Sequence, residues 1–97
     1  MKGYVIAEVE VTDPTLFEQY RQGVPPTVAA YGGRYLVRGG AVTPAEGGWN
    51  PKRLIILEFP DVATAKAWHD SAAYTPLKAM RERAARSRII IVEGAAP

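Results

Sequence analysis

The sequence contains no cysteine and a single histidine, His69. Without cysteine the chain forms no disulfide and offers no thiolate to a metal ion or to redox chemistry. A metal or haem site would depend on His69 alone, because no second histidine or cysteine is there to join it. We therefore expect no metal and no tightly bound cofactor, and the lack of cysteine fits a reducing compartment.

The sequence also lacks a signal-peptide core and a hydrophobic run long enough to span a bilayer. Its formal net charge is +2, and the basic excess lies in one segment, "LKAMRERAARSR" (77–88). Basic residues near the end of a helix usually form a solvated face, and no aromatic side chain lies between these residues to stack on bases. We expect a cytoplasmic protein that binds neither membranes nor nucleic acid.

Hydrophobic residues at every second position predict a strand over residues 3–11. Asp13 followed by Pro14 predicts a capped helix start, and apolar residues then recur at helical spacing. Pro25 and Pro26 are expected to kink or split this helix, because proline lacks the backbone N–H and its ring clashes with the preceding turn.

The rest of the chain repeats this alternation of strand and helix signals. The further predicted elements are a strand over 33–40, a strand over 52–59, a helix over 62–69 capped by Asp61, a helix from Thr75 to Ala84 and a strand over 88–93. The segment "AVTPAEGGWN" (41–50) between the first two of these strands is too long for a tight hairpin turn.

This order of elements predicts one α+β domain over residues 1–97 with the ferredoxin-like βαββαβ arrangement. The sheet would be four-stranded and antiparallel, in the strand order four, one, three, two, with the helices on one face. The opposite face would carry Ile6, Leu36, Leu54, Ile56, Ile89 and Ile91. Such a face is too apolar to remain in water, so we expect it to pair with itself in a two-fold homodimer.

Five stretches of the sequence together resemble the family called domain of unknown function 1330, and they cover nearly the whole chain. They are "GYVIAEVEVTDP", "YGGRYLVRGG", "WNPKRLIILEFPD", "WHDSAAYTPLKAMR" and "IIIVEG". The resemblance implies a ferredoxin-like fold that dimerises by facing sheets into an α+β barrel. It places the chain in a superfamily that includes cofactor-free monooxygenases, small isomerases and haem enzymes, but it implies no particular activity.

Three residues of the "WHDSAAY" segment have both a packing and a functional interpretation. Members of the resembled family more often carry tyrosine at the position of His69, which favours a packed or half-buried histidine over a catalyst. Trp68 and Tyr74 are expected to pack the second helix on the sheet. Alternatively, they line a pocket between sheet and helices for a flat organic molecule, with the Tyr74 hydroxyl as the polar group.

Charged residues at both ends of the uncovered face are the sharpest anomaly of the sequence. Alternation assigns to this face Tyr4, Ile6 and Glu8, then Arg34, Leu36 and Arg38, then Leu54, Ile56 and Glu58, and finally Ile89, Ile91 and Glu93. Antiparallel pairing would bring Glu58 toward Tyr4 and Arg34 at one end, and Glu8 toward Arg38 at the other. Charges on a buried face must be paired or await a ligand.

Two functions remain open on these residues. In the first, the chain is a homodimeric enzyme without bound cofactor that acts by proton transfer or oxygenation on a small oxygenated organic substrate. Glu58, Arg34 and Tyr4 would then be catalytic, while Arg38, Glu8, Trp68, Tyr74 and Arg81 would bind the substrate. In the second, the chain is a binding or structural module whose interfacial charges fix the register of the dimer.

Overall fold

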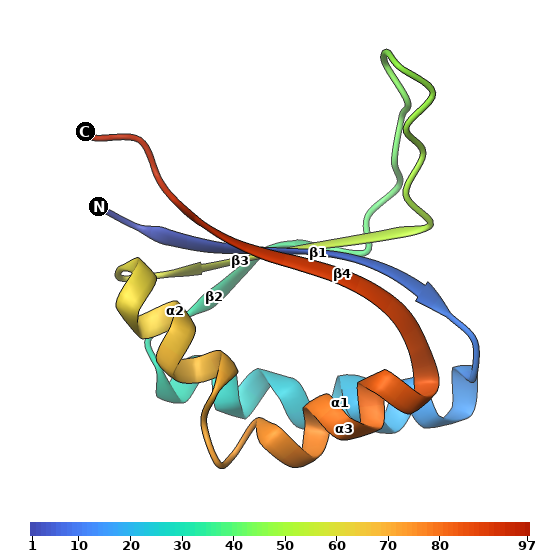
Figure 1. Ribbon diagram of the computed structural model, residues 1–97, viewed down its shortest axis with the longest axis horizontal. Coiled ribbons are helices and arrows are strands. Elements are labelled where there is room, and N and C mark those ends of the chain that lie inside the picture. Colours follow the sequence, from blue (N-terminus) through green and yellow to red (C-terminus); the bar gives the residue numbers. More distant parts are fainter.

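A computed structural model describes residues 1–97 and contains four strands and three helices (Figure 1). In chain order these are β1 (Gly3–Val11), α1 (Pro14–Ala30), β2 (Arg34–Arg38), β3 (Arg53–Phe59), α2 (Val62–His69), α3 (Thr75–Ala84) and β4 (Ala85–Glu93). The fold is the predicted ferredoxin-like α+β arrangement. None of the helices has the length and hydrophobicity that crossing a membrane requires.

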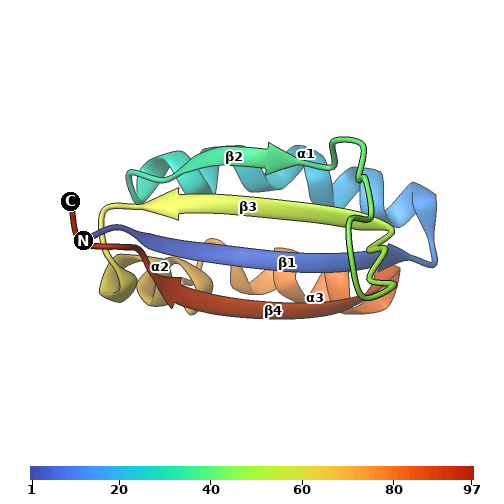
Figure 2. The same ribbon diagram turned by 90° about the horizontal axis from the view of Figure 1, so that it is seen from above.

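The sheet is antiparallel, with the strand order β2-β3-β1-β4 (Figure 2). All three helices cover one of its faces, with α1 behind β2 and β3 and the pair α2 and α3 behind β1 and β4. The opposite face carries no helix, as the sequence predicts. The sheet therefore has one face packed against helices and one that its own chain leaves open.

The predicted caps form, and α1 is not split at its prolines. Asp13 and Asp61 cap α1 and α2, each accepting a hydrogen bond from a backbone N–H three residues on. Pro25 and Pro26 lie inside one continuous helix. Proline has no backbone N–H, so the carbonyls four residues earlier, those of Arg21 and Gln22, lose their helical hydrogen bonds. Both residues are exposed, so water can donate to these carbonyls instead.

The hydrophobic core fills the layer between the sheet and the helices. Its buried members are Val5, Ala7, Val9, Phe17, Tyr20, Val24, Val28, Leu57, Phe59, Ala65, Trp68, Tyr74, Ala84 and Ala85. Trp68 lies between two aromatic neighbours, with ring centroids 5.3 Å from Phe59 and 4.2 Å from Tyr74. Trp68 and Tyr74 therefore belong to the core between the helices and the sheet, as the packing interpretation predicts.

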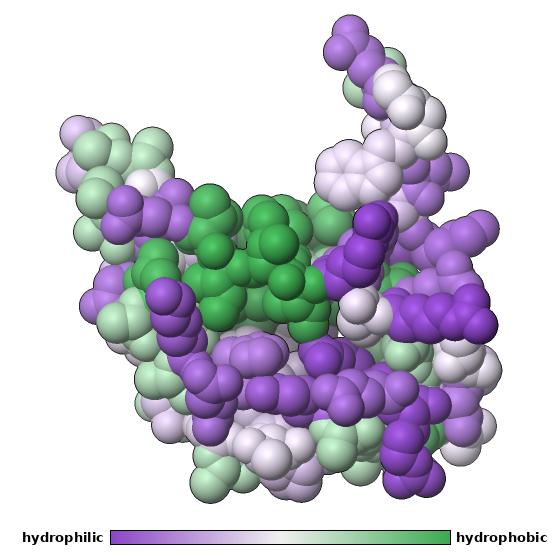
Figure 3. Space-filling model, in the orientation of Figure 1, coloured by the Kyte–Doolittle hydropathy of each residue, from purple (hydrophilic) through white to green (hydrophobic).

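The open face is apolar along its middle, as Figure 3 shows between the chain termini and the loop that follows β2. In β1 and β3 its members are as predicted, since Tyr4 pairs with Glu58, Ile6 with Ile56 and Glu8 with Leu54. Its complete apolar set is Ile6, Val37, Leu54, Ile56, Ile90 and Val92, with Leu36 exposed beside it.

The prediction for β4 was wrong by one residue. Ile90 pairs with Ile6, so Ile90 shares the open face, while Ile89 and Ile91 pack against the helix side. The strand begins at Ala85, directly after α3 and buried, rather than at Arg88, and that start sets the alternation. Glu93, opposite Gly3, is likewise moved off the open face.

The prediction for the end of β2 was also wrong. A β-bulge between Tyr35 and Val37 leaves Leu36 without a partner and shifts the alternation by one residue. Arg38 then pairs with Ile55 and lies on the helix side of the sheet. Its guanidinium carbon lies 4.4 Å from the centre of the Tyr35 ring, which faces the same side.

Candidate functional site

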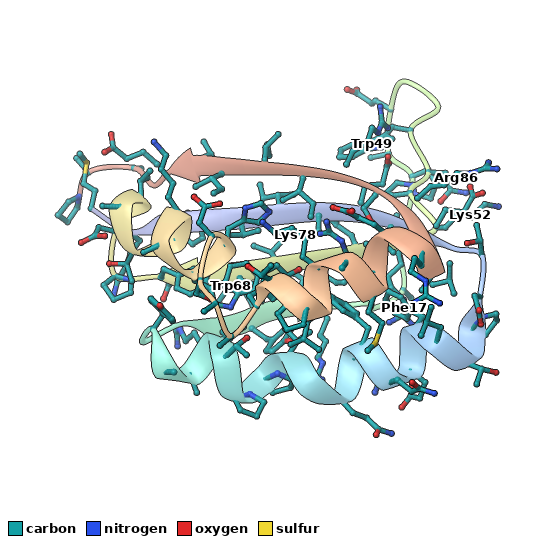
Figure 4. All side chains as sticks on the ribbon, turned by 60° about the horizontal axis from the view of Figure 1, so that its bottom comes forward. Phe17, Trp49, Lys52, Trp68, Lys78 and Arg86 are labelled. Carbon is teal, nitrogen blue, oxygen red and sulfur yellow. The ribbon has the colours of Figure 1, made fainter.

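An interior cavity of about 40 Å³ lies between the sheet and the helices, within the core layer. Its lining comprises Val5, Ala7, Val9, Phe17, Tyr20, Arg21, Val24, Tyr35, Arg38, Arg53, Ile55, Leu57, Trp68, Tyr74, Arg81 and Ile89. Figure 4 labels two of these, Phe17 of α1 and Trp68 of α2, which project into the space between the helices and the sheet. The cavity brings together four of the five predicted binding residues: Trp68, Tyr74, Arg81 and Arg38.

Two tyrosines supply the buried hydroxyl groups of the cavity. The hydroxyls of Tyr20 and Tyr74 lie 2.8 Å apart and share a hydrogen bond. Burial raises the pKa of both side chains, so both hydroxyls stay protonated at neutral pH. The indole N–H of Trp68 is already engaged, because it donates to Thr27 Oγ1 at 3.0 Å. The tyrosine pair therefore supplies the buried hydroxyl groups of the lining, whereas the indole N–H of Trp68 is used within the core.

Arg81 is the buried charge of the cavity, with 7% of its surface exposed. Its Nη1 lies 3.5 Å from the Tyr74 hydroxyl, and its Nε has no hydrogen-bond partner. No carboxylate pairs with it. The sequence predicts a solvated face for the basic segment 77–88, and the burial of Arg81 departs from that prediction.

The rim of the cavity carries three further arginines: Arg21, Arg38 and Arg53. The guanidinium carbon of Arg53 lies 5.2 Å from the centre of the Phe17 ring, and that of Arg38 stacks on Tyr35. No aspartate or glutamate is among the lining residues. The interior site is consequently apolar in its walls and uniformly positive in its charge.

The three residues predicted to be catalytic form a separate cluster on the open face of the sheet. The Tyr4 hydroxyl donates to Glu58 Oε2 at 3.1 Å, and Arg34 Nε donates to Glu58 Oε1 at 2.9 Å. The hydrogen bond from Arg34 is the main cause of a lowered pKa of Glu58, and that from Tyr4 adds to it. A carboxylate so stabilised is a weak base at neutral pH, and both its oxygens are occupied.

Glu8 meets Arg88 at the other end of the open face, not Arg38 as predicted. Arg88 Nε donates to Glu8 Oε1 at 2.9 Å, and the indole N–H of Trp49 donates to Glu8 Oε2 at 2.7 Å. The hydrogen bond from Trp49, followed by that from Arg88, lowers the pKa of Glu8. These three residues border a hollow of about 270 Å³ together with Ile6, Leu54 and Ile90.

Sequence reasoning missed Arg88 and Trp49 for two reasons. The shifted β4 register hid the pairing of Arg88 with Glu8, and Trp49 lies in a segment that has no periodic pattern. That segment, residues 39–52, rises from the sheet on the side away from the helices and lies over the ends of β3 and β1 (Figures 1 and 2). Lys52 and Arg86 line one hollow beside this segment and Trp49 lines another; Figure 4 labels all three.

The two carboxylates of the open face predict an acid-sensitive stability. Since folding lowers the pKa of Glu8 and Glu58, their contribution to the free energy of unfolding is complete above the ordinary value of 4.5 and is lost as pH falls below it. The variant Glu8→Gln/Glu58→Gln should therefore lose less stability on acidification. Unfolding midpoints measured at a series of pH values test this, with Glu46→Gln in the exposed loop as the control. An equally steep decline in the double variant would contradict the assignment.

His69 lies outside the cavity lining and has no histidine or cysteine near it. Its Nδ1 is 3.4 Å from Asp70 Oδ1 and 3.4 Å from Lys78 Nζ, and 28% of its side chain is exposed. No group of three or more histidine, cysteine or carboxylate side chains is placed to hold a metal ion. His69 is therefore half-buried, as its position next to Trp68 predicts.

Solved structures with the same fold come from several bacteria. A protein of unknown function from Rhodopseudomonas palustris has a TM-score of 0.73 and 17% identity over 99% of this chain and 84% of its own. A dimeric ferredoxin-like protein of unknown function from Jannaschia sp. has a TM-score of 0.70 and 12% identity over 97% and 100% of the two chains. The cofactor-independent oxygenase SnoaB from Streptomyces nogalater has a TM-score of 0.63 and 10% identity over 99% and 95%.

At these identities the likeness extends to the fold alone. No curated protein matches the sequence. The family model described as domain of unknown function 1330 matches residues 2–95, nearly the whole chain, as the five stretches of sequence predict. The chain belongs to this family, domain of unknown function 1330.

Proposed function

We propose that the chain is a homodimeric enzyme that binds a small oxygenated organic molecule in the interior cavity. It acts on that molecule by proton transfer or oxygenation, without a tightly bound cofactor. The observation that carries this proposal is the cavity itself, where Arg81 and Tyr74 converge inside apolar walls. An apolar pocket with a few convergent polar groups is the usual form of a small-molecule site.

The polar groups of the cavity suit a substrate oxygen that gains negative charge. Arg81 and the hydroxyl of Tyr74 can both donate to such an oxygen, and their burial strengthens each interaction. The cavity holds no carboxylate and no imidazole, so Tyr20, Tyr74 or water must carry a transferred proton. Tyr4, Arg34 and Glu58 lie on the other side of the sheet, which moves the proposed chemistry from those residues to the cavity.

The oxygenation alternative draws support from one structural neighbour, the cofactor-independent oxygenase SnoaB. In such chemistry the substrate itself supplies the electrons that reduce molecular oxygen, so no bound cofactor is needed. Stabilisation of a substrate enolate by Arg81 and Tyr74 would serve either reaction, because both begin with loss of a proton from carbon.

The homodimer would form through the open face of the sheet. Ile90 is 59% exposed and Val92 41%, and both belong to one apolar surface with Ile6 and Ile56. A contiguous apolar face of this kind marks a protein interface. Structural neighbours from Jannaschia sp. and Thermobifida fusca are described as dimeric, which supports the same assembly here. Segment 39–52 stands on the side where the partner sheet would lie.

A non-enzymatic module is the second candidate, and the paired charges of the open face favour it. Glu58 and Glu8 each accept two or more hydrogen bonds from side chains of their own chain, so neither awaits a ligand. Such pairs would fix the register of two facing sheets without any chemistry. The interior cavity argues only against a purely structural module, which has no use for a buried arginine without a partner; turnover of the ligand distinguishes an enzyme from a binding module.

A thermal-shift screen of metabolites tests the proposed function. A ligand at 100 times its dissociation constant stabilises the folded state by about 2.7 kcal/mol. For a domain of this size each kcal/mol raises the midpoint by roughly 4–8 °C. We expect at least one small oxygenated compound to stabilise the wild type and to be consumed on prolonged incubation, with a lower rate for Tyr74→Phe. A stabilising compound that is never consumed would favour the binding module, and a screen without any stabilising compound would contradict a ligand site.

A further inference from the structure

The charges around the interior cavity are all of one sign. Four arginines, Arg21, Arg38, Arg53 and Arg81, are among its sixteen lining residues, and no acidic residue is. Arg21 has a carboxylate neighbour outside the cavity, Glu18 at 3.8 Å, whereas the other three make no ion pair. In a chain with ten acidic residues, this one-sided arrangement leaves the cavity without a counter-charge.

Arg81 bears the greatest electrostatic cost of this arrangement. It is 93% buried, its Nε has no partner, and its one side-chain hydrogen bond is long. The end of α3 relieves part of the cost, because a positive charge in the last turn of a helix interacts favourably with the helix dipole. An isolated buried charge nevertheless requires a partner of opposite sign or a dense set of hydrogen bonds.

The neighbouring tyrosines do not provide that partner. Tyr74 and Tyr20 share one hydrogen bond between their hydroxyls, and both remain neutral phenols. A neutral hydroxyl can accept one hydrogen bond from Arg81, but it leaves the charge uncompensated. The missing group must therefore come from outside the chain.

Size limits what can enter. The cavity volume is about 40 Å³, room for a few water molecules, whereas a cavity of about 150 Å³ accommodates benzene. A carboxylate group and a short carbon chain suit this space better than a ring. The rest of a longer molecule would pass between Arg38 and Arg53, whose guanidinium groups stack on Tyr35 and Phe17 at the rim.

We propose that the ligand of the cavity is a small organic anion, a carboxylate or enolate, whose charged oxygens bind Arg81 and the Tyr74 hydroxyl. The inference rests on the proposed function in one respect, that the interior cavity is the ligand site. It adds the chemical class of the ligand and names Arg81 as the residue that selects it. The arginines of the rim attract the anion, and the apolar walls pack against its carbon chain.

Matched pairs of acid and amide test this assignment, because the two members of a pair differ in charge and little in shape. The pairs are acetate and acetamide, propionate and propionamide, and butyrate and butyramide, titrated calorimetrically in amine buffer. For at least one pair we expect the acid to bind about tenfold tighter than the amide or more, the effect of one hydrogen-bonded charge. In Arg81→Gln the preference should fall to within about twofold.

Arg83→Gln is the control, because Arg83 lies in the same last turn of α3 and is exposed. It should keep the preference for the acid. Equal affinity for acids and amides would overturn the inference and leave the cavity as a site for neutral molecules. A preference for the acid that survives in Arg81→Gln would also overturn it, because Arg81 would not be the residue that selects the anion. Failure of all three acids to bind would also overturn it. The proposed function fails separately, when neither acids, amides nor metabolites bind. If Arg81→Gln does not fold, the affinities of the wild type for acids and for amides decide whether the ligand is an anion.

Discussion

Ile56→Glu is expected to convert a dimer into a folded monomer. Ile56 lies on β3 in the middle of the open face, opposite Ile6 on one side and Val37 on the other. A two-fold interface would bury the new carboxylate twice, once from each subunit. The carboxylate would lie two residues from Glu58 on the same strand, and the residues opposite it, Ile6 and Val37, offer no basic group. At about 3 kcal/mol for each unpaired buried charge, association should weaken by roughly 10⁴-fold.

Light scattering with the variant at micromolar concentration measures this effect. The wild type should have twice the chain mass and Ile56→Glu the mass of one chain, while circular dichroism shows that the variant is folded. Ile56→Val is the matched control and should remain dimeric, because it keeps the apolar surface and loses one methylene group. A variant that stays dimeric would place the interface elsewhere than the open face.

Arg81→Met is expected to raise the stability of the ligand-free protein by about 1–4 kcal/mol, the range seen when buried ion pairs are replaced by apolar residues of similar volume. Methionine fills the space of the arginine stem and removes a guanidinium that has no carboxylate partner. Most substitutions of a buried residue destabilise, so a gain here has a specific cause.

Urea unfolding in an amine buffer gives the free energy of unfolding for both proteins. Arg83→Met, in the same helical turn but exposed, should change it by less than about 0.5 kcal/mol. A loss of stability in Arg81→Met comparable to that of other core substitutions would mean that the arginine is satisfied in the folded chain. The cavity would then not need an anion.

The sequence predicts the fold because its local signals agree with one another. The alternation of apolar residues in β1 determines which of its side chains face the helices, and Asp13 and Asp61 mark helix starts that the structure confirms. Pro25 and Pro26 did not split α1, and the two residues whose carbonyls lose a backbone donor, Arg21 and Gln22, are exposed. The pairing of Glu58 with Tyr4 and Arg34 followed from strand order and needed no other information.

The candidate site was less predictable, for physical reasons that lie in the same residues. The run Ile89, Ile90, Ile91 has no alternation, so nothing in the sequence says which of the three faces the helices; the tight junction at Ala85 decides it. The bulge after Tyr35 has no sequence signature, yet it turns Arg38 to the other side of the sheet. Burial of Arg81 depends on how α3 packs, which local sequence does not report.

The two tryptophans provide the most direct test of the interior site, because they report on two separate places where a ligand could bind. Trp68 lines the cavity, and Trp49 borders the hollow on the open face. An NMR titration of ¹⁵N-labelled protein with the most strongly stabilising compound reports on both indole N–H groups at once. The interior site predicts that the signal of Trp68 shifts and that of Trp49 does not. A shift confined to Trp49 would contradict it.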